Sequence, residues 1–263
     1  MSKLYDIIDK LEETQSLERQ EFVQLLDNLS EPLAQYTYEK ARKTAQKYFG
    51  HRIYIRGLIE ISNYCKNDCL YCGIRRSNRN ADRYRLNKDD VLNCCHTGYN
   101  LGFRTFVLQG GEDPFYSDDF LVDLITEVKE NYPDCAITLS LGERSRDSYQ
   151  QLFDAGADRY LLRHETADEK HYSKLHANEQ VLGTRKACLQ NLQDIGYQTG
   201  TGFMVGSPWQ TNENLAQDLL FVKELSPAMV GIGPFIPHHD TPFAEKTQGA
   251  LDKTLFLIAL LRL

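Results

Sequence analysis

Three of the seven cysteines lie together in one short segment, as Cys65, Cys69 and Cys72, a C-x3-C-x2-C spacing. Core packing gives no reason for three thiols to sit so close together. Cysteine thiolates are the usual ligands of iron–sulfur clusters, which normally take four. Three local thiolates would leave one iron of a cubane cluster open to a small molecule, as a catalytic zinc site keeps one position open. The spacing therefore predicts a 4Fe-4S cluster with one open iron.

A zinc site with three cysteines and one histidine is the alternative for the same segment. Its fourth ligand would come from a distant position, because the nearest histidines are His51 and His96. Structural zinc modules also favour C-x2-C pairs at both ends, and the sequence has no second pair. The remaining cysteines show no ligand spacing, and we expect them to be small buried apolar side chains. They are Cys94, Cys95, Cys135 and Cys188.

The apolar pattern predicts the elements that must position these thiols. Helical spacing over residues 1–50, with Ser30 placed to cap a segment that begins Glu31-Pro32, predicts a helical leader. From residue 51 onward, short apolar runs alternate with amphipathic segments. The predicted strands are 53–61, 105–108, 136–141, 159–163, 199–205 and 229–232. The predicted helices are 88–101, 118–131, 146–155, 179–195, 212–225 and 251–263.

Alternating strands and helices indicate an α/β fold with a parallel sheet and right-handed crossovers. We predict two parts, a helical leader over 1–50 and a TIM-type βα barrel with six βα units over 51–263. A complete barrel of this type has eight units. Because the last predicted helix is apolar and lacks a cap, we expect a barrel truncated from eight units, with a six-unit open barrel as the alternative.

Functional groups of βα barrels lie on loops at the carboxyl ends of the strands. Gly110 and Gly111 follow the second predicted strand and would let the backbone approach a ligand closely. Glu112 would accept hydrogen bonds from an ammonium group, and Arg163 and Arg185 would bind a carboxylate. An amino-acid-like ligand on an open iron would need these groups. His164, beside Arg163, is either a proton shuttle or a buried core histidine.

Charge and hydropathy exclude several classes of partner. The chain has 30 Lys and Arg against 37 Asp and Glu, a formal net charge of −7, which disfavours nucleic acid and anionic membrane surfaces. No apolar segment approaches the roughly 20 residues that span a bilayer. The N-terminal segment lacks the apolar core of a signal peptide. We therefore expect a cytoplasmic protein with no nucleic-acid and no membrane partner.

The cysteine segment, with the aromatic Tyr71 just before the third cysteine, resembles the signature of the radical S-adenosylmethionine (SAM) superfamily. The resemblance implies that the three thiolates hold a 4Fe-4S cluster and that SAM chelates the open iron through its amino and carboxylate groups. It also implies that one electron from the reduced cluster cleaves a C–S bond of SAM to give a 5′-deoxyadenosyl radical. Gly110-Gly111-Glu112 resembles the superfamily motif that contacts the amino group of SAM.

Five longer stretches resemble the HydE family of FeFe-hydrogenase maturases, and this likeness runs from about residue 1 to the end. The stretches are 69–76, 108–114, 138–143, 158–166 and 229–238. The biotin synthase and methylornithine synthase families belong to the same branch but resemble the chain less in the Arg-His-Glu-Thr and Gly-Pro-Phe-Ile-Pro stretches. HydE proteins continue past this sequence to complete an eight-unit barrel, so cavity residues of the last two units are absent from it.

The resemblance also implies roles for single residues. The expected SAM-binding residues are Tyr71, Gly110, Gly111, Glu112, Ser140, Glu165, Arg185 and Met204. The residues expected to face the barrel cavity and bind an anionic substrate are Arg56, Thr138, Arg159 and Arg163. The implied substrate is a small molecule or iron complex, namely a cysteine-bound iron carrying carbon monoxide and cyanide. The implied partners are a reduced ferredoxin or flavodoxin-like electron donor and other hydrogenase maturation proteins.

Two alternative functions stay open at this point. The first is a related radical SAM synthase or mutase that acts on a small amino acid. The second is a non-catalytic iron–sulfur or zinc protein that binds a maturation partner. Product formation from lysine rather than from the iron complex would indicate the first alternative. A protein that binds metal but does not cleave SAM when reduced would indicate the second.

Overall fold

Six parallel strands form one sheet in chain order, β1-β2-β3-β4-β5-β7, in a computed structural model that describes residues 2–263. The strands are β1 Gly57–Ser62, β2 Thr105–Gly110, β3 Ala136–Ser140, β4 Arg159–Leu161, β5 Gln198–Thr201 and β7 Met229–Val230. All five pairings are parallel, so the carboxyl ends of the strands lie at one edge. This arrangement confirms the predicted α/β class. The strands β1 and β7 are the two ends of the sheet and do not pair with each other within residues 2–263.

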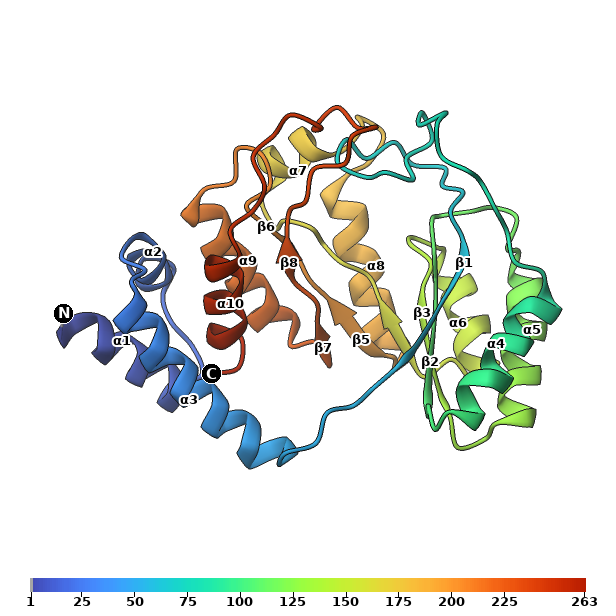
Figure 1. The fold of residues 1–263 in the computed structure, drawn as a ribbon, viewed down its shortest axis with the longest axis horizontal. Coiled ribbons are helices and arrows are strands. Elements are labelled where there is room, and N and C mark those ends of the chain that lie inside the picture. Colours follow the sequence, from blue (N-terminus) through green and yellow to red (C-terminus); the bar gives the residue numbers. More distant parts are fainter. Residues whose placement is uncertain (1) are drawn as a thin grey trace.

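Helices after the strands cover the outer side of the curved sheet (Figure 1). They are α4 Lys88–Asn100, α5 Asp118–Asn131, α6 Arg146–Asp154, α8 Leu182–Ile195, α9 Asn212–Leu225 and α10 Leu251–Leu260. Leu121, Leu124 and Val128 of α5 pack with Phe106 and Leu108 of β2 in one buried cluster. Burial of about 25 cal/mol per Å2 of apolar surface stabilises this layer and fixes the strand ends relative to one another.

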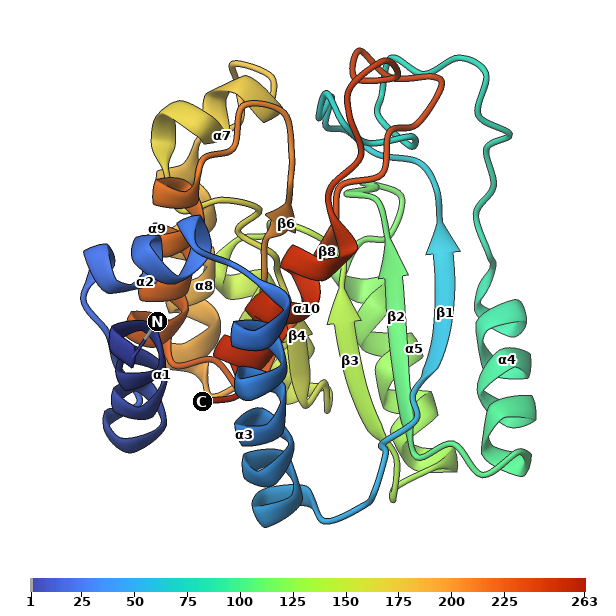
Figure 2. The ribbon, with the colours of Figure 1, turned by 60° about the vertical axis from the view of Figure 1, so that its left-hand side comes forward.

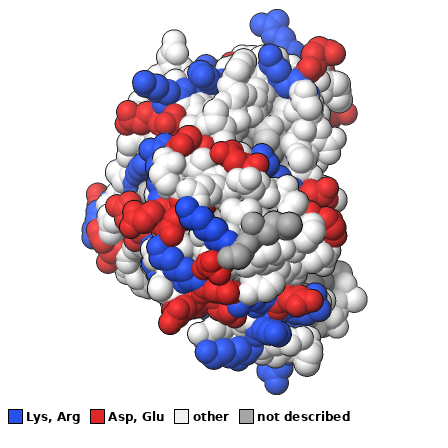
Figure 3. All heavy atoms as spheres, turned by 90° about the vertical axis from the view of Figure 1, so that its left-hand side faces the viewer, with Lys and Arg blue, Asp and Glu red and all other residues white. Residues whose placement is uncertain are grey.

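Three helices precede the sheet, as the sequence predicts: α1 Ser2–Thr14, α2 Arg19–Asp27 and α3 Glu31–Phe49. Ser30 occupies the N-cap position of α3, and Gly50 follows its last turn with a φ of 61°. Buried side chains of these helices, including Leu25 and Leu33, pack against α9 and α10, and Figure 2 shows them on that side of the molecule. On the face in Figure 3, basic and acidic side chains alternate, and Lys10–Glu21 is one of the ion pairs between the leader helices.

Most predicted strands are shorter in the structure, among them 136–141, 159–163 and 229–232, and one is divided. The predicted strand 53–61 begins only at Gly57, because residues before it have no neighbouring strand and Ile53 is 88% exposed. The predicted strand 199–205 is divided, since β6 Met204–Val205 leaves the main sheet and pairs with β8 Gly233–Pro234. Gly202 lies between the two parts, where a Cβ would stand 1.8 Å from the carbonyl oxygen of Gly231. This close backbone approach marks the bend.

Three other predictions differ from the structure. The helix predicted over 179–195 begins at Leu182, and a short helix that the sequence did not predict, α7 Glu169–Leu175, precedes it. Cys94 is exposed, whereas the other three cysteines outside the motif are buried. Cys94 and Cys95 are adjacent on α4, and only one of two consecutive helix positions can face the sheet.

No helix within residues 2–263 is both long and apolar enough to span a bilayer.

Candidate active site

The cysteine motif lies in the loop between β1 and α4, over the carboxyl ends of the strands. Cys65, Cys69 and Cys72 are free and half-buried. The amide of Cys72 donates to the carbonyl of Cys69 at 3.2 Å, which folds the second and third thiols into one turn. The amide of Leu70 donates to the carbonyl of Leu175 at 2.9 Å, so α7 supports the motif from the other side. The loop thus holds three thiols in a supported position at the functional edge of the sheet.

Charged side chains fix this loop from within. The Arg75 guanidinium donates two hydrogen bonds to the Asp68 carboxylate, at 2.8 and 2.6 Å. Arg83 donates to the backbone carbonyls of Ile74 and Asn78, at 2.9 and 3.0 Å. A bidentate arginine–carboxylate pair has a defined geometry as well as strength. These bonds hold the loop in place without any contribution from the thiols.

The thiols fit a metal cluster rather than free thiolates. Burial raises the pKa of Cys69 to about 12 and also raises the pKa values of Cys65 and Cys72. Each neighbouring thiolate opposes ionisation of the next. A bound cation reverses this balance, because a coordinating thiol is deprotonated outright. Three neighbouring half-buried thiols are a suitable donor set for an iron–sulfur cluster.

The Gly110-Gly111-Glu112 segment lies directly against the cysteine loop. The amide of Lys66 donates to the carbonyl of Glu112 at 2.9 Å. A Cβ on Gly111 would stand 2.1 Å from the carbonyl oxygen of Tyr64 and 2.8 Å from Cβ of Cys65. Only glycine allows this approach. The segment therefore brings the Glu112 carboxylate to the cysteines.

A network of buried charges links this segment to α8. Glu112 and Arg185 are both 9% exposed, and Oε1 of Glu112 lies 3.7 Å from Nη2 of Arg185. Lys66 Nζ lies 3.2 Å from Glu112 Oε2. Arg185 Nε lies 2.6 Å from Oε1 of Glu143, a residue that the sequence analysis did not include among the site residues. Its position directly after Leu141-Gly142, just beyond the end of β3, was the available signal. The groups expected to bind the amino and carboxylate ends of SAM are thus paired with one another here.

Glu165 and Arg163 form a second pair beside the network. Nη2 of Arg163 donates to Oε2 of Glu165 at 3.0 Å, and Nη1 of Arg185 donates to the carbonyl of Arg163 at 3.3 Å. Glu165 has a φ of 65°, a left-handed conformation that is unusual for a residue other than glycine. The structure therefore joins the ends of β2, β3 and β4 to α8 through one set of charged side chains.

An apolar cluster completes the site near the third cysteine. Met204 is buried and packs with Tyr71, Leu70 and Phe235. Burial raises the pKa of Tyr71, and its hydroxyl lies 3.3 Å from Nε2 of His176. This cluster gives the site a flat apolar surface beside the charged one, a suitable combination for a nucleoside with an amino-acid tail.

The remaining predicted residues lie at different positions along the strands, some of them at the amino ends. Ser140 ends β3 and lies opposite Gln109 of β2, near the Gly-Gly-Glu segment. Thr138 is in register with Arg159, so their side chains share one face of the sheet. Arg159 is the first residue of β4 and donates to Gln198 at 2.8 Å, whereas Arg56 directly precedes β1. Arg56 and Arg159 thus lie at the opposite strand ends from the cysteines, and Arg163 lies on the cysteine side.

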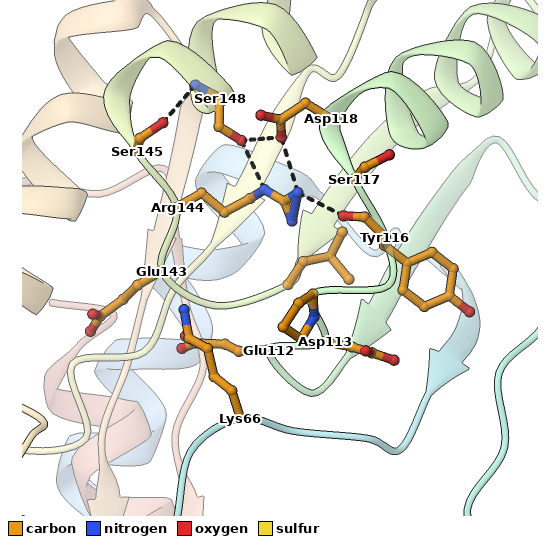
Figure 4. Close-up of a pocket in the computed structure, with 12 residues that line it drawn as sticks. Lys66, Glu112, Asp113, Tyr116, Ser117, Asp118, Glu143, Arg144, Ser145 and Ser148 are labelled. Carbon is orange, nitrogen blue, oxygen red and sulfur yellow. Dashed lines mark hydrogen bonds and ion pairs between the residues drawn. The ribbon is translucent and has the colours of Figure 1, made fainter.

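A cavity of about 390 Å3 borders the charged network. Its lining includes Glu112 and Glu143, and Figure 4 shows Lys66 beside Glu112. The guanidinium of Arg144 points to Asp118 and Ser148, to which it donates hydrogen bonds at 3.0 and 2.8 Å. The Glu143 carboxylate points away from Arg144 in the same view, so Arg144 stays outside the network.

The chain is similar to several known proteins. The Radical SAM superfamily matches residues 59–222. The FeFe hydrogenase maturase subunit HydE of Thermotoga maritima is 43% identical over 256 residues, which cover 95% of this chain and 72% of that protein. The 3-methylornithine synthase of Methanosarcina acetivorans is 31% identical over 91% of this chain and 68% of its own length.

Solved structures give the same picture of the fold. The crystal structure of methylornithine synthase (PylB) matches with a TM-score of 0.89 and 29% identity, over 97% of this chain and 75% of that one. A crystal structure of the maturase HydG matches with a TM-score of 0.86 over 100% of this chain and 61% of that one. At 22% identity the HydG match supports the fold alone.

Proposed function

We propose that this chain, which belongs to the radical SAM superfamily and within it to the HydE family, acts in assembly of the di-iron active site of FeFe hydrogenase. The C-x3-C-x2-C loop seated on Gly110-Gly111-Glu112 is the observation that carries the proposal. The 43% identity to a HydE maturase over 95% of the chain supports the same assignment. The proposal treats residues 1–50 as a helical leader and 51–263 as the radical SAM barrel segment.

Members of the superfamily use a 4Fe-4S cluster and SAM, and the three thiols fit that cluster. Cys65, Cys69 and Cys72 would hold it and leave one iron for SAM. When bound, the reduced cluster supplies the electron that cleaves SAM to a 5′-deoxyadenosyl radical. The chain's own contribution is to hold SAM in one orientation and keep its ionic ends out of water.

The charged network is suited to the amino-acid end of SAM. Glu112 would accept hydrogen bonds from the amino group, and Arg185 would donate to the carboxylate. Both side chains are buried. Glu112 is paired with Lys66, and Arg185 is paired with Glu143. An incoming zwitterion exchanges one ionic partner for another, so neither group becomes an unpaired buried charge. Glu143 keeps the Arg185 guanidinium in place during that exchange.

The apolar cluster and the two following strand ends would bind the adenosine end. Tyr71 and Met204 supply a flat apolar surface beside the third cysteine. Ser140 and Glu165, at the ends of β3 and β4, would accept or donate hydrogen bonds to the sugar and base. Gly110 and Gly111 leave room for the ligand to lie close to the backbone.

The substrate would bind farther along the concave face. Arg56, Thr138, Arg159 and Arg163 supply three positive charges and a hydroxyl for an anionic small molecule or iron complex. Two buried atoms there, Oγ1 of Thr138 and Nε of Arg163, have no hydrogen-bond partner within residues 2–263. Buried polar atoms are normally satisfied, so a polar substrate is a natural partner for both. The proposed substrate is a cysteine-bound iron carrying carbon monoxide and cyanide.

The proposed partners are a reduced ferredoxin or flavodoxin-like electron donor and other hydrogenase maturation proteins. A cytoplasmic location fits a protein whose thiols must stay reduced. Neither nucleic acid nor a membrane is part of the proposal.

A comparison of two substrates, supplied separately, tests this function. The cluster-loaded, reduced chain is given SAM with either the cysteine-bound iron complex or lysine, and products are identified by mass spectrometry. The proposal predicts turnover of the iron complex and none of lysine. R159M should reduce turnover of the iron complex while leaving SAM cleavage without substrate unchanged, because Arg159 lies at the strand end opposite the cysteines. Turnover of lysine alone would instead favour an amino-acid synthase or mutase.

A further inference from the structure

His164 and Asp218 form a completely buried pair outside the set of residues expected to touch SAM or substrate. Both side chains are 0% exposed, and Nε2 of His164 lies 3.4 Å from Oδ1 of Asp218. His164 follows β4, whereas Asp218 lies in the middle of α9. Within residues 2–263, Nε2 of His164 and Oδ2 of Asp218 have no hydrogen-bond partner. Buried polar atoms normally have a hydrogen-bond partner, so the positions of the protons on this pair need explanation.

The hydrogen bonds around His164 define where its proton lies. The Thr201 hydroxyl donates to the carbonyl of Leu162 at 3.1 Å. It therefore accepts from Nδ1 of His164, which lies at 2.9 Å, and a neutral imidazole keeps its lone pair on Nε2, toward Asp218. Burial lowers the pKa of His164 to about 3 and raises that of Asp218 well above its ordinary value. Burial thus opposes charge on both members of the pair.

Asp218 also holds the backbone that follows His164. The amide of Ala167 donates to Oδ1 of Asp218 at 2.5 Å. Gln217, the preceding residue of α9, donates from Nε2 to the carbonyl of Ala167 at 3.0 Å. Two consecutive helix residues thus bind both polar groups of Ala167. The segment 164–167 is fastened to α9 at each of its ends.

Glu165 lies inside this fastened segment. Its φ of 65° is costly for a glutamate and persists only where the surroundings impose it. Its amide donates to the carbonyl of Gly202 at 3.0 Å, and its carbonyl accepts from the amide of Met204 at 3.3 Å. These backbone bonds and the contacts of Asp218 fix the backbone of Glu165, and its side chain meets Arg163 at 3.0 Å.

We propose that Asp218 is a positioning residue of the SAM site, which holds Glu165 in its left-handed conformation through His164 and Ala167. Asp218 itself does not touch the ligand. It transmits the position of α9 to the end of β4 through the hydrogen bond that it accepts from Ala167. The inference rests on the SAM-binding role proposed for Glu165.

Two substitutions of similar size separate this role from simple packing. In D218N, the amide oxygen still accepts from Ala167, so SAM affinity stays close to that of the wild type. D218L fills the same space but cannot accept from the amide of Ala167, and we expect it to weaken SAM binding about tenfold or more, as loss of a supporting partner commonly does. Equilibrium dialysis of SAM against the cluster-loaded, unreduced protein measures both, with thermal unfolding recorded in parallel.

A control and a double mutant distinguish positioning from general destabilisation. T254V removes the hydroxyl of another buried residue, on α10, and leaves SAM affinity unchanged. In an E165Q background, D218L adds less than about twofold, because sites that act through each other are not additive. Full additivity, or D218N as weak as D218L, would overturn the proposal. If D218L does not fold, H164L removes the same link from its other side and is expected to weaken SAM binding likewise.

SAM binding by the wild-type protein distinguishes a failure of the proposed function from a failure of the role proposed for Asp218. If it binds no SAM, the proposed function fails whatever the variants do. If it binds SAM and folded D218L or H164L binds it equally well, the function stands and the positioning role of Asp218 is wrong.

Discussion

Gly111→Ala is the substitution for which the structure predicts the largest loss from the smallest change. The added Cβ would stand 2.1 Å from the carbonyl oxygen of Tyr64, whereas ordinary contact begins at 3.4 Å. The difference, 3.4 − 2.1 = 1.3 Å, is the distance by which the cysteine loop must retreat. The atoms in the way belong to the backbone and to Cβ of Cys65, so no flexible side chain can yield instead.

A shift of this size exceeds what the site tolerates. Metal ligands must lie within about 0.2 Å of their ideal distances. A misplacement of about 1 Å in a positioned reaction can cost roughly 100-fold in rate. We therefore expect G111A to lower cluster occupancy and to reduce SAM cleavage about 100-fold or more. The helices and the rest of the sheet lie outside the contact and should unfold at the wild-type temperature.

The assay measures iron and sulfide per chain after anaerobic reconstitution, then 5′-deoxyadenosine after reduction in the presence of SAM. Gly231→Ala is the matched control, because nothing lies within 4 Å of its added Cβ. G231A should load its cluster and cleave SAM like the wild type. A G111A variant that did the same would refute the reasoning that Gly111 seats the cysteine loop.

Three further predictions concern the surroundings of the same site. E143Q removes the negative charge that holds Arg185, and equilibrium dialysis should show SAM binding about tenfold weaker; unchanged affinity would remove Glu143 from the site. G142A places a Cβ 1.9 Å from Cγ of Glu112 at a φ of 77°, so SAM affinity should fall, whereas G183A, whose Cβ meets its nearest atom at 3.9 Å, should bind SAM normally. D113N should lower the free energy of unfolding by about 2 kcal/mol at neutral pH by breaking the Arg85 pair. Burial raises the pKa of Asp113, but Arg85 and Ser62 outweigh it and lower the pKa below 3.8. The stabilisation is therefore present above pH 3.8 and lost below it, so urea unfolding of D113N and wild type should converge in acid. A gap that stays constant with pH would contradict the ion pair.

Local patterns in the sequence predicted the parts of the fold that depend on them. The six strand–helix units follow from apolar periodicity, and α5 and α9 have the predicted bounds. The cysteine spacing located the loop that carries the thiols. The carboxyl ends of parallel strands meet at one edge, so the prediction that Glu112 and Arg163 lie near those thiols needed only the strand order.

Features that depend on contacts between distant residues were not predictable in this way. The bend at Gly202 is imposed by Gly231, and the residues before Gly57 are not a strand because no neighbour pairs with them. The helix α7 is short and polar, so its period carries little signal. The partners of Arg185 and His164 lie on other elements. Only its place after Leu141-Gly142 marks Glu143, and no local pattern marks Asp218.

Cleavage of SAM by the purified chain tests the central claim most directly. The chain is reconstituted without oxygen, reduced, and supplied with SAM, and 5′-deoxyadenosine is measured by chromatography. We predict its formation by the wild type and by C188A, which alters a buried cysteine outside the motif, and its absence in C65A, C69A and C72A. A wild type with an intact 4Fe-4S cluster that forms none, or a motif variant that still forms it, would contradict the assignment of these three thiols to a radical SAM centre.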